Sequence, residues 1–353
     1  MRFPNRRQFL ALAGAGTAAA SSGGVRRARA ATKELYIGSY SDIQDVVKKV
    51  WVAPFEEKYG VKVYVSAGAS MDQLAKMRAE QGRPRHSVMM MDDAIINVAR
   101  RFDLVAPLPK ASMPSLAEVY PELIVEGGYG VAIAIHNAGV AYHKPGKAPA
   151  SWRDLWGAGL ERQVLIPSIK LTNGIMMLVM ASSLKTGKPV REAQYDIGPG
   201  FEEIARLKPN LLNMFTQTTG AINLLIQGEV KFAAPFFSKN VYRFVRDGAP
   251  IDMVLPKEGG FIGVNAACLV KGAPEPELAA QFLDFGLSAP VQQAFAREAV
   301  AGPVNSKADL PEDLRKKVPF GAEALKRLHF LDWGYINDHR DEWTERWNKE
   351  IAA

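Results

Sequence analysis

Cysteine, histidine and long apolar runs are all scarce in this chain of 353 residues. Cys268 is the only cysteine, so no disulfide can form within the chain. The five histidines include no pair at the H-x-x-x-H spacing of a helical metal site. Cysteine clusters for iron and sulfur and the C-x-x-C-H pattern for haem are also missing. These absences argue against a metal centre, whereas an organic cofactor stays open.

The first thirty residues are typical of an export signal. A twin-arginine stretch, Asn5 to Leu10, precedes a weakly apolar run from Phe9 to Ala20 and a small-residue cleavage pattern that ends at Ala30. This apolar run is shorter than the roughly 20 residues that span a bilayer. We therefore expect residues 1–30 to be a signal peptide that the twin-arginine translocase recognises, and the mature protein to act in the periplasm.

Most of the positive charge belongs to that signal. The formal net charge of +7 comes from 44 basic and 37 acidic residues, and six of the arginines but no acidic residue lie in residues 1–30. The mature chain therefore keeps 38 basic and 37 acidic residues, a net charge of +1. A chain so close to neutrality offers no electrostatic footprint for nucleic acid or an anionic membrane.

Short β-rich runs alternate with helical periodicity in the first third of the mature chain. Leu35–Ile37, Val61–Val65 and Ser87–Met91 predict strands, each followed by a turn and a helical pattern. Three such units in succession predict a parallel sheet covered by helices. The turns after parallel strands collect at one edge, where ligands bind. The run Met89–Met91 is interpreted as core packing, because it lies in an apolar strand.

A second α/β region begins after His143. Residues 164–167 and 229–234 predict strands, and residues 171–183 predict a buried helix. Residues 261–270 form an extended run that can return to the first region.

Two crossings between the regions predict a hinged protein of two lobes. Residues 31–139 together with 266–353 form the expected first lobe, and residues 140–265 form the second. The mature chain is long enough for two domains of ordinary size.

Several landmarks follow one another in a characteristic order. They are Tyr36 to Tyr40 after the first strand, Pro54 to Val63, the helix start Thr172-Asn173-Gly174, the turn Pro256 to Gly260, Ala279 to Phe285, Pro303-Val304-Asn305, and Arg340 to Asn348. In this order, over nearly all of residues 33–350, the chain resembles the periplasmic solute-binding components of ABC importers. The resemblance is to the cluster that holds spermidine/putrescine-binding and ferric-iron-binding proteins.

The resemblance implies a type II periplasmic binding protein fold, an α/β protein of two Rossmann-like lobes joined by crossover hinge strands. The lobes of such a protein close around a small organic solute, because the closed form binds it more tightly than the open form. The resemblance also implies delivery to ABC permease subunits in the inner membrane, a monomer, no cofactor and no catalytic residue, since no bond is made or broken.

Candidate ligand residues of the first lobe lie at strand ends. They are Ser39, Tyr40, Ser70 and Asp92. Ser70 opens a helix whose free N–H groups suit an anion, and Asp92 suits an amine. Alternatively, Ser70 and Asp92 are ordinary helix caps and Tyr40 is a half-buried turn aromatic.

Candidates of the second lobe follow the same logic. They are Ser168, Thr172, Asn173, Phe215, Thr216, Gln217, Phe236 and Ser238, with Tyr142 and Asn265 expected where the lobes meet. Helix capping explains Thr172 and Asn173 almost equally well, and Tyr142 and Asn265 are equally well read as satisfied buried polar groups. Alternation along a strand predicts that one of Phe236 and Phe237 faces the core and the other the cleft.

The ligand class is narrowed by departures from the relatives. Polyamine binders carry Trp-x-Asp after the Glu-Gly-Gly turn, where this chain has Gly263-Val264-Asn265, and an acid on the helix near Thr172, where it has Asn173. Ferric-iron binders use paired tyrosines, where this chain has Phe236-Phe237. We therefore expect an amine, an amino-acid-like compound or a small anion, and neither a polyamine nor iron.

Two alternatives stay open. One is a periplasmic enzyme exported folded around an organic cofactor, which would explain the twin-arginine route. The other is a binding protein whose closed form docks on a membrane sensor instead of a permease.

Overall fold

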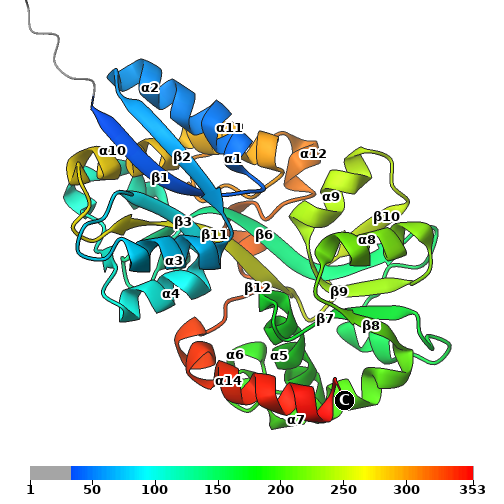
Figure 1. Cartoon of the computed structure of the whole chain (residues 1–353). Helices are drawn as coiled ribbons and strands as arrows, with labels where there is room; N and C mark the ends of the chain where they lie inside the picture. Colours follow the sequence, from blue (N-terminus) through cyan, green and yellow to red (C-terminus); the bar gives the residue numbers. More distant parts are fainter. Residues whose placement is uncertain (1–32, 353) are drawn as a thin grey trace, which may run out of the picture. The chain divides into compact units, whose positions relative to one another are not determined.

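The structure is a computed structural model that describes residues 33–352 (Figure 1). The predicted signal peptide, residues 1–30, lies outside the described residues. From Lys33 onward the chain belongs to one unit, a mixed α/β fold built on a twelve-stranded sheet.

The N-terminal part of this sheet is parallel. Strand β1 (Glu34–Tyr40) pairs with β2 (Lys62–Gly68) on one side and β3 (Val88–Asp92) on the other, so the three predicted strands are confirmed. The three methionines of β3 are fully buried, as core packing requires. Helical segments follow each strand: α1 (Gln44–Val47), the π-helical η1 (Lys48–Val52), α2 (Ala53–Tyr59), α3 (Ser70–Ala79) and α4 (Asp93–Arg101).

Two long antiparallel strands, β6 (Gly130–His143) and β11 (Gly260–Val270), occupy the middle of the sheet. Strand β11 pairs with β3, and β6 pairs with β9 (Phe232–Phe237), so these two strands join the N-terminal part of the sheet to the rest. The extended return run predicted over 261–270 is confirmed. The register places Asn265 opposite Asp92 and Gly263 opposite His136.

The remaining part of the sheet is again parallel. Strand β7 (Val164–Pro167) lies between β8 (Leu211–Phe215) and β9. The strand predicted over 229–234 begins later, at Phe232, because Gly228 in the left-handed region (φ 76°) ends the preceding helix and the chain must first turn back. Its helices are α5 (Thr172–Thr186), α6 (Val190–Ala193), α7 (Gly198–Leu207), α8 (Thr218–Gln227) and α9 (Ser238–Arg246), and β10 (Ile251–Val254) pairs with β6.

Separate apolar clusters support the two sides of the molecule. On the N-terminal side, Trp51 stacks on Phe282 of α10 (Pro276–Leu287), and α11 (Ala289–Ala299) joins the same cluster. On the other side, α14 (Trp333–Glu350) contacts α7 and buries Trp347 in the same cluster as Trp152 (Figure 1). The C-terminal helix therefore shares its buried face with the region that the sequence assigns to the second lobe, although 266–353 was placed with the first. The lobe boundaries themselves stay a prediction.

Short elements complete the described chain. They are β4 (Val105–Ala106), β5 (Ile124–Val125), β12 (Leu328–His329), α12 (Glu312–Arg315), α13 (Gly321–Leu325), and the 3-10 segments η2 (Lys110–Ser112), η3 (Pro114–Glu118), η4 (Pro121–Leu123), η5 (Trp152–Trp156) and η6 (Lys208–Asn210). No helix within residues 33–352 combines the length and apolar character that crossing a membrane requires.

Candidate functional site

A cavity of about 290 Å³ lies where β3 ends beside the middle of β6 and β11. Both sides of the molecule contribute to its wall. The charged and polar lining residues are Asp42, Asp92, Asp93, His136, Thr172, Thr218, Lys239, Asn240 and Asn265, and the others are Met176, Phe237, Ile262, Gly263, Val264 and Trp333. Three carboxylates and one ammonium group, flanked by two aromatic rings, give this cavity a polar character biased toward negative charge.

Asp92 is the last residue of β3, and two hydroxyl groups lie beside it. Its own N–H donates to Ser70 Oγ at 3.1 Å, and the Tyr40 hydroxyl lies near its carboxylate. Burial raises the pKa of Asp92, while the Lys239 ammonium and the two hydroxyls oppose that rise. Within residues 33–352, no basic side chain forms an ion pair with this carboxylate.

A chain of polar groups leads from Asp92 to His136. The Tyr40 hydroxyl is bonded by the Asn265 side chain and also accepts from the N–H of Ala266 at 3.1 Å. Asn265 Oδ1 lies 2.9 Å from Nε2 of His136. Burial, followed by the nearby Asp92, raises the pKa of Tyr40 well above its ordinary value, so this hydroxyl stays protonated.

His136 ends this chain with one ring nitrogen unsatisfied. It is 3% exposed, lies on β6 and lines the cavity. Burial and the Lys239 charge lower its pKa to about 3, so the imidazole is neutral at physiological pH. Its Nδ1 atom has no hydrogen-bond partner among the described residues.

Asp93 is the first residue of α4 and contacts an aromatic residue from the far end of the chain. Its Oδ2 accepts from Trp333 Nε1 at 3.0 Å, and its Oδ1 accepts from the N–H of Ala94 at 2.9 Å. Burial, and then the like charge of Asp92, raise the pKa of Asp93 to about 7. This carboxylate therefore changes charge near neutral pH.

The beginning of α14 is fastened to α4, which fixes Trp333 at the cavity. Asn337 Nδ2 donates to the carbonyl of Ala94 at 3.0 Å, and Arg101 Nη2 donates to the carbonyl of Gly334 at 2.8 Å. The Trp333 side chain is consequently buried (7% exposed) beside Asp93. The site thus combines elements that are 240 residues apart in the sequence.

The opposite wall carries the ammonium group and the second aromatic ring. Lys239 Nζ lies 3.0 Å from Asp42 Oδ2, which links α9 to the turn after β1. Phe237 is the last residue of β9, and its ring covers Gly263: a Cβ at that glycine would lie 2.6 Å from a Phe237 ring atom. Gly263 is therefore required for this ring to reach the cavity.

The structure brings Asp92, Thr172 and Asn265 of the predicted residues to the cavity wall. Tyr40 and Ser70 stand directly behind Asp92 and position it. Sequence reasoning therefore found the β3 end and the helix start of α5, where parallel strands and helices meet.

Four other predicted residues are buried as structural groups outside the cavity lining. Ser39 donates to the carbonyl of Tyr40, and Asn173 Nδ2 donates to that of Pro235 at 2.9 Å. Ser238 Oγ accepts from the N–H of Asn137 at 3.2 Å. Phe236 is 1% exposed and faces the core, and Phe237 faces the cavity, because successive side chains of a strand point to opposite sides.

The remaining predicted residues lie outside the cavity lining, although the helices that follow them reach it. Ser168, Phe215, Thr216 and Gln217 lie at the ends of β7 and β8, whereas Thr172 and Thr218, at the starts of the next helices, line the cavity. Phe215 packs on Phe236, and Thr216 and Gln217 are exposed. Tyr142 lies near the end of β6, opposite Asp252 of β10.

Among the charged, polar and aromatic lining residues, sequence reasoning missed Asp42, Asp93, His136, Thr218, Lys239, Asn240 and Trp333. Asp93 and Lys239 each directly follow a predicted residue, so the strand-end rule extended by one position would have found them. His136 lies inside a long apolar strand, and Trp333 comes from the C-terminal tail. No local signal in the sequence marks these last two residues.

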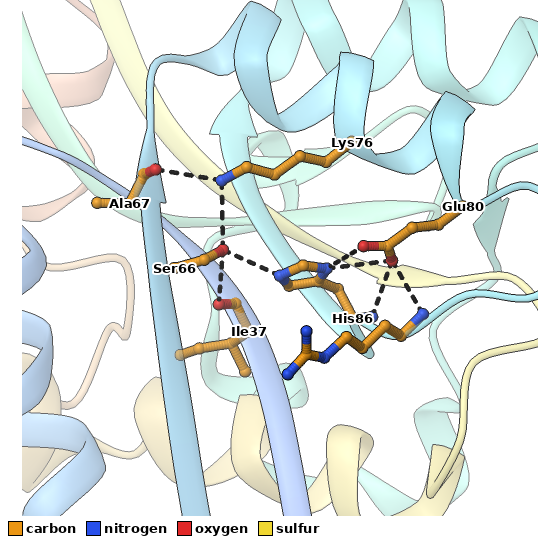
Figure 2. A network of polar contacts seen from close by, with 7 residues as sticks. Ile37, Ser66, Ala67, Lys76, Glu80 and His86 are labelled. Atoms are coloured by element: carbon orange, nitrogen blue, oxygen red, sulfur yellow. Dashed lines mark hydrogen bonds and ion pairs between the residues drawn. The ribbon is translucent and has the colours of Figure 1, made fainter.

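A second polar network also contains a histidine, Glu80–His86–Ser66 (Figure 2). His86 Nδ1 lies 2.8 Å from Glu80 Oε1, and its Nε2 lies 2.9 Å from Ser66 Oγ. Burial opposes ionisation of Glu80, but N–H groups of Arg85 and His86 donated to its carboxylate hold its pKa below the ordinary value. No sequence pattern predicts that Ser66 lies beside His86.

This network contains the residue types of a hydrolytic triad, but its serine already has other hydrogen-bond partners. Ser66 Oγ also lies 3.3 Å from Lys76 Nζ and 3.4 Å from the carbonyl oxygen of Ile37. Glu80 binds the turn that leads from α3 to β3 (Figure 2). We interpret the network as a structural fastening of that turn.

Metal ligation finds no support in the described residues. Within residues 33–352, no group of three or more histidine, cysteine or acidic side chains is arranged to hold a metal ion. The cavity residues are instead suited to binding an organic molecule, with carboxylates for a cation, aromatic faces for its apolar part and amide or hydroxyl groups for polar atoms.

Comparison with known proteins identifies consistent relatives. Residues 50–322 match the family model described as bacterial extracellular solute-binding protein. The chain is 23% identical to the spermidine/putrescine-binding periplasmic protein 1 of Haemophilus influenzae, over 79% of each chain. It is 24% identical to the gamma-aminobutyric acid-binding protein of Pseudomonas aeruginosa, over 86% of this chain and 87% of the relative. An ABC transporter crystal structure from Clostridium perfringens superposes with a TM-score of 0.80 at 23% identity, over 90% of this chain and 99% of that chain.

Proposed function

The chain belongs to the bacterial extracellular solute-binding protein family, and we propose that it captures a small amine or amino-acid-like solute for an ABC importer. The solute is bound, carried and released unchanged, so the protein is not an enzyme. Release takes place at permease subunits in the inner membrane.

The observation that carries this proposal is the charge of the cavity. Asp42 is paired with Lys239, whereas Asp92 and Asp93 have no cationic partner in the described chain. Carboxylates that are buried without a counter-ion favour the binding of a cation, because the cation restores the interaction that burial removes. The Trp333 and Phe237 rings add cation–π attraction and apolar contact. A protonated amine satisfies all of these groups.

Lys239 extends the choice to zwitterions. Its ammonium group lines the same cavity and is held by a single carboxylate, that of Asp42, which is exposed. A solute with an amine at one end and a carboxylate at the other can place the amine at Asp92 and Asp93 and the carboxylate at Lys239. The gamma-aminobutyric acid-binding relative supports this amino-acid-like class, and the polyamine-binding relatives support the amine class.

Other groups in the cavity replace the tryptophan and the acidic residues that polyamine binders carry. Where those relatives carry tryptophan, this chain has Gly263 with the Phe237 ring over it, and Trp333 supplies a second ring. Asn265 occupies the place of the aspartate, while Asp93 supplies a carboxylate from the start of α4. The cavity thus offers cation-binding groups from other elements of the fold.

The mechanism follows from the two long strands. We infer that β6 and β11 act as hinge strands between the lobes. Helix α14 also connects the lobes, because it shares the buried cluster of the second and is hydrogen-bonded to α4 of the first. A solute that contacts both walls stabilises the closed form. The twin-arginine signal, the periplasmic location and the monomeric state complete this proposal.

A thermal-shift screen tests the function. The purified protein is freed of bound solute by unfolding and refolding, then heated with monoamines, diamines, amino acids, organic acids or sugars. We expect the melting temperature to rise with amines or amino acids and to stay unchanged with sugars and simple organic acids. A folded protein that responds only to anions, or to none of the classes, would contradict the proposed function.

A further inference from the structure

We propose that the cavity selects cations that carry at least one N–H, and discriminates against quaternary ammonium compounds, through the unpaired Nδ1 atom of His136. This inference rests on the proposed function, because it names which amines the same cavity accepts.

The orientation of the Asn265 amide determines the role of each His136 nitrogen. The Asn265 side chain acts as a donor toward the Tyr40 hydroxyl, whose pKa it lowers, so its amide NH2 group lies on the Tyr40 side. The Asn265 Oδ1 atom then faces His136 Nε2, at 2.9 Å. An oxygen acceptor requires a donor, so Nε2 carries the ring proton.

The other ring nitrogen is consequently a hydrogen-bond acceptor. In a neutral imidazole that is protonated on Nε2, Nδ1 presents a lone pair. This atom has almost no accessible surface in the solute-free structure and no partner among the described residues, so a solute N–H reaches it only after a rotation of the ring toward the cavity that His136 lines. Lys239, the ammonium group of the lining, is bonded to Asp42 instead.

An unpaired buried acceptor makes a binding site selective. A solute N–H that reaches Nδ1 restores a hydrogen bond, whereas a solute without one leaves the acceptor desolvated and unpaired. Sites built to bond a solute N–H discriminate strongly against analogues that lack it. The aromatic rings attract any cation, whereas Asp92 and Asp93 also accept hydrogen bonds from a solute N–H, so the contribution of His136 must be measured in a variant that keeps both carboxylates.

Quaternary ammonium groups provide the decisive contrast. Their charge suits Asp92, Asp93 and the rings of Trp333 and Phe237, but their methyl groups donate no hydrogen bond. If aromatic contacts and charge alone governed the site, a trimethylated amine would bind as well as its parent. The His136 acceptor predicts a preference of at least tenfold for the parent amine.

Calorimetric titration of matched pairs tests this inference. The probes are butylamine, putrescine and 4-aminobutyrate, each compared with the analogue that is fully methylated at nitrogen. At least one parent should bind at least tenfold more tightly than its methylated partner. Equal binding within every pair that binds would overturn the selectivity but leave the proposed function intact. If neither member of any pair binds to the folded protein, the proposed function fails as well.

Two variants separate the acceptor from the size of the methyl groups. His136→Leu removes both nitrogens at similar volume, and His136→Gln retains a donor for Asn265 and a carbonyl acceptor. We expect the preference to fall to threefold or less in His136→Leu and to be largely retained in His136→Gln. An unchanged preference in folded His136→Leu would show that the carboxylates or the size of the methyl groups discriminate without His136 and would overturn the inference.

Nitrogen NMR of His136 supplies a readout that does not depend on a variant. The Nδ1 resonance of the wild-type protein should shift when a parent amine binds, because the lone pair becomes hydrogen-bonded. It should stay in place with the methylated analogue. Equal shifts with both compounds, or none with a bound parent amine, would contradict the assigned contact.

Discussion

His86 and His136 are both buried histidines in hydrogen-bonded networks, but only one network is complete. His86 contacts Glu80 through Nδ1 and Ser66 through Nε2 (Figure 2). His136 contacts Asn265 through Nε2, and its Nδ1 has no partner in the described chain. The first network fastens a turn outside the cavity lining, and the second forms part of that lining.

This difference distinguishes a network that stabilises the fold from one that is suited to bind a solute. A complete buried network stabilises the fold, because every polar group regains the hydrogen bonds lost with water. A network with an unpaired acceptor and carboxylates without counter-ions is less favourable by itself, and a guest that completes it binds tightly. The triad-like composition of the His86 network is therefore a weaker sign of function than the unpaired hydrogen-bond acceptor in the His136 network.

Asp92→Asn should have the largest effect, because it weakens solute binding without weakening the fold. The asparagine keeps the Ser70 and Tyr40 hydroxyls as neighbours, but the charge that attracts an amine is lost. We expect affinity for an amine that binds the wild type to fall by a hundredfold or more, about 3 kcal/mol. The free energy of unfolding without solute should stay equal or rise, because a desolvated carboxylate has been removed. Loss of stability with affinity retained would show that Asp92 has a structural role and does not bind the solute.

His86→Ala should show the reverse pattern with a smaller effect. The change leaves Glu80 and Ser66 without their imidazole partner, which costs about 2 kcal/mol of the free energy of unfolding. Denaturant titration measures this loss, and calorimetry should find solute affinity within twofold of the wild type. Ser66→Ala is the matched control, expected to weaken stability less. A large drop in affinity for either variant would show that the two networks are coupled.

Much of the fold follows from local sequence pattern. The first three strands, the buried strand 164–167 and the return run 261–270 were predicted from alternation and apolar runs. These elements are fixed by side chains close to one another in sequence. Strand β9 begins later than predicted, because the turn after Gly228 is longer than the sequence pattern indicates.

Less of the site could be predicted, because its residues meet only through tertiary structure. Asp92 was found at a strand end, but Tyr40 and Ser70 proved to position it from behind. Trp333 reaches Asp93 because α14 is fastened to α4, which no local pattern indicates. His136 lies among apolar neighbours in β6, where the sequence resembles an ordinary core strand.

The third prediction concerns pH and has the smallest effect. Burial and the like charge of Asp92 raise the pKa of Asp93 to about 7, so its carboxylate is ionised at pH 8 and largely neutral at pH 6. Amine binding favours the ionised form, so affinity should fall about tenfold between pH 8 and pH 6, roughly 1.4 kcal/mol. His136, with a pKa of about 3, stays neutral over this range. Calorimetry at both pH values measures the change, which Asp93→Asn should largely abolish.

Stability without solute should change with pH in the opposite direction. Because the pKa of Asp93 is higher in the folded state than its ordinary value of 3.8, folding favours the protonated form. The stabilisation of that form is complete below about pH 4 and is lost as pH rises through about 7. The unfolding free energy of the solute-free wild type should therefore decrease over this interval relative to Asp93→Asn, while affinity increases. A single carboxylate whose pKa is raised by burial requires affinity to rise with pH while the free energy of unfolding falls. If both quantities changed in the same direction with pH, Asp93 would not be the group that controls them.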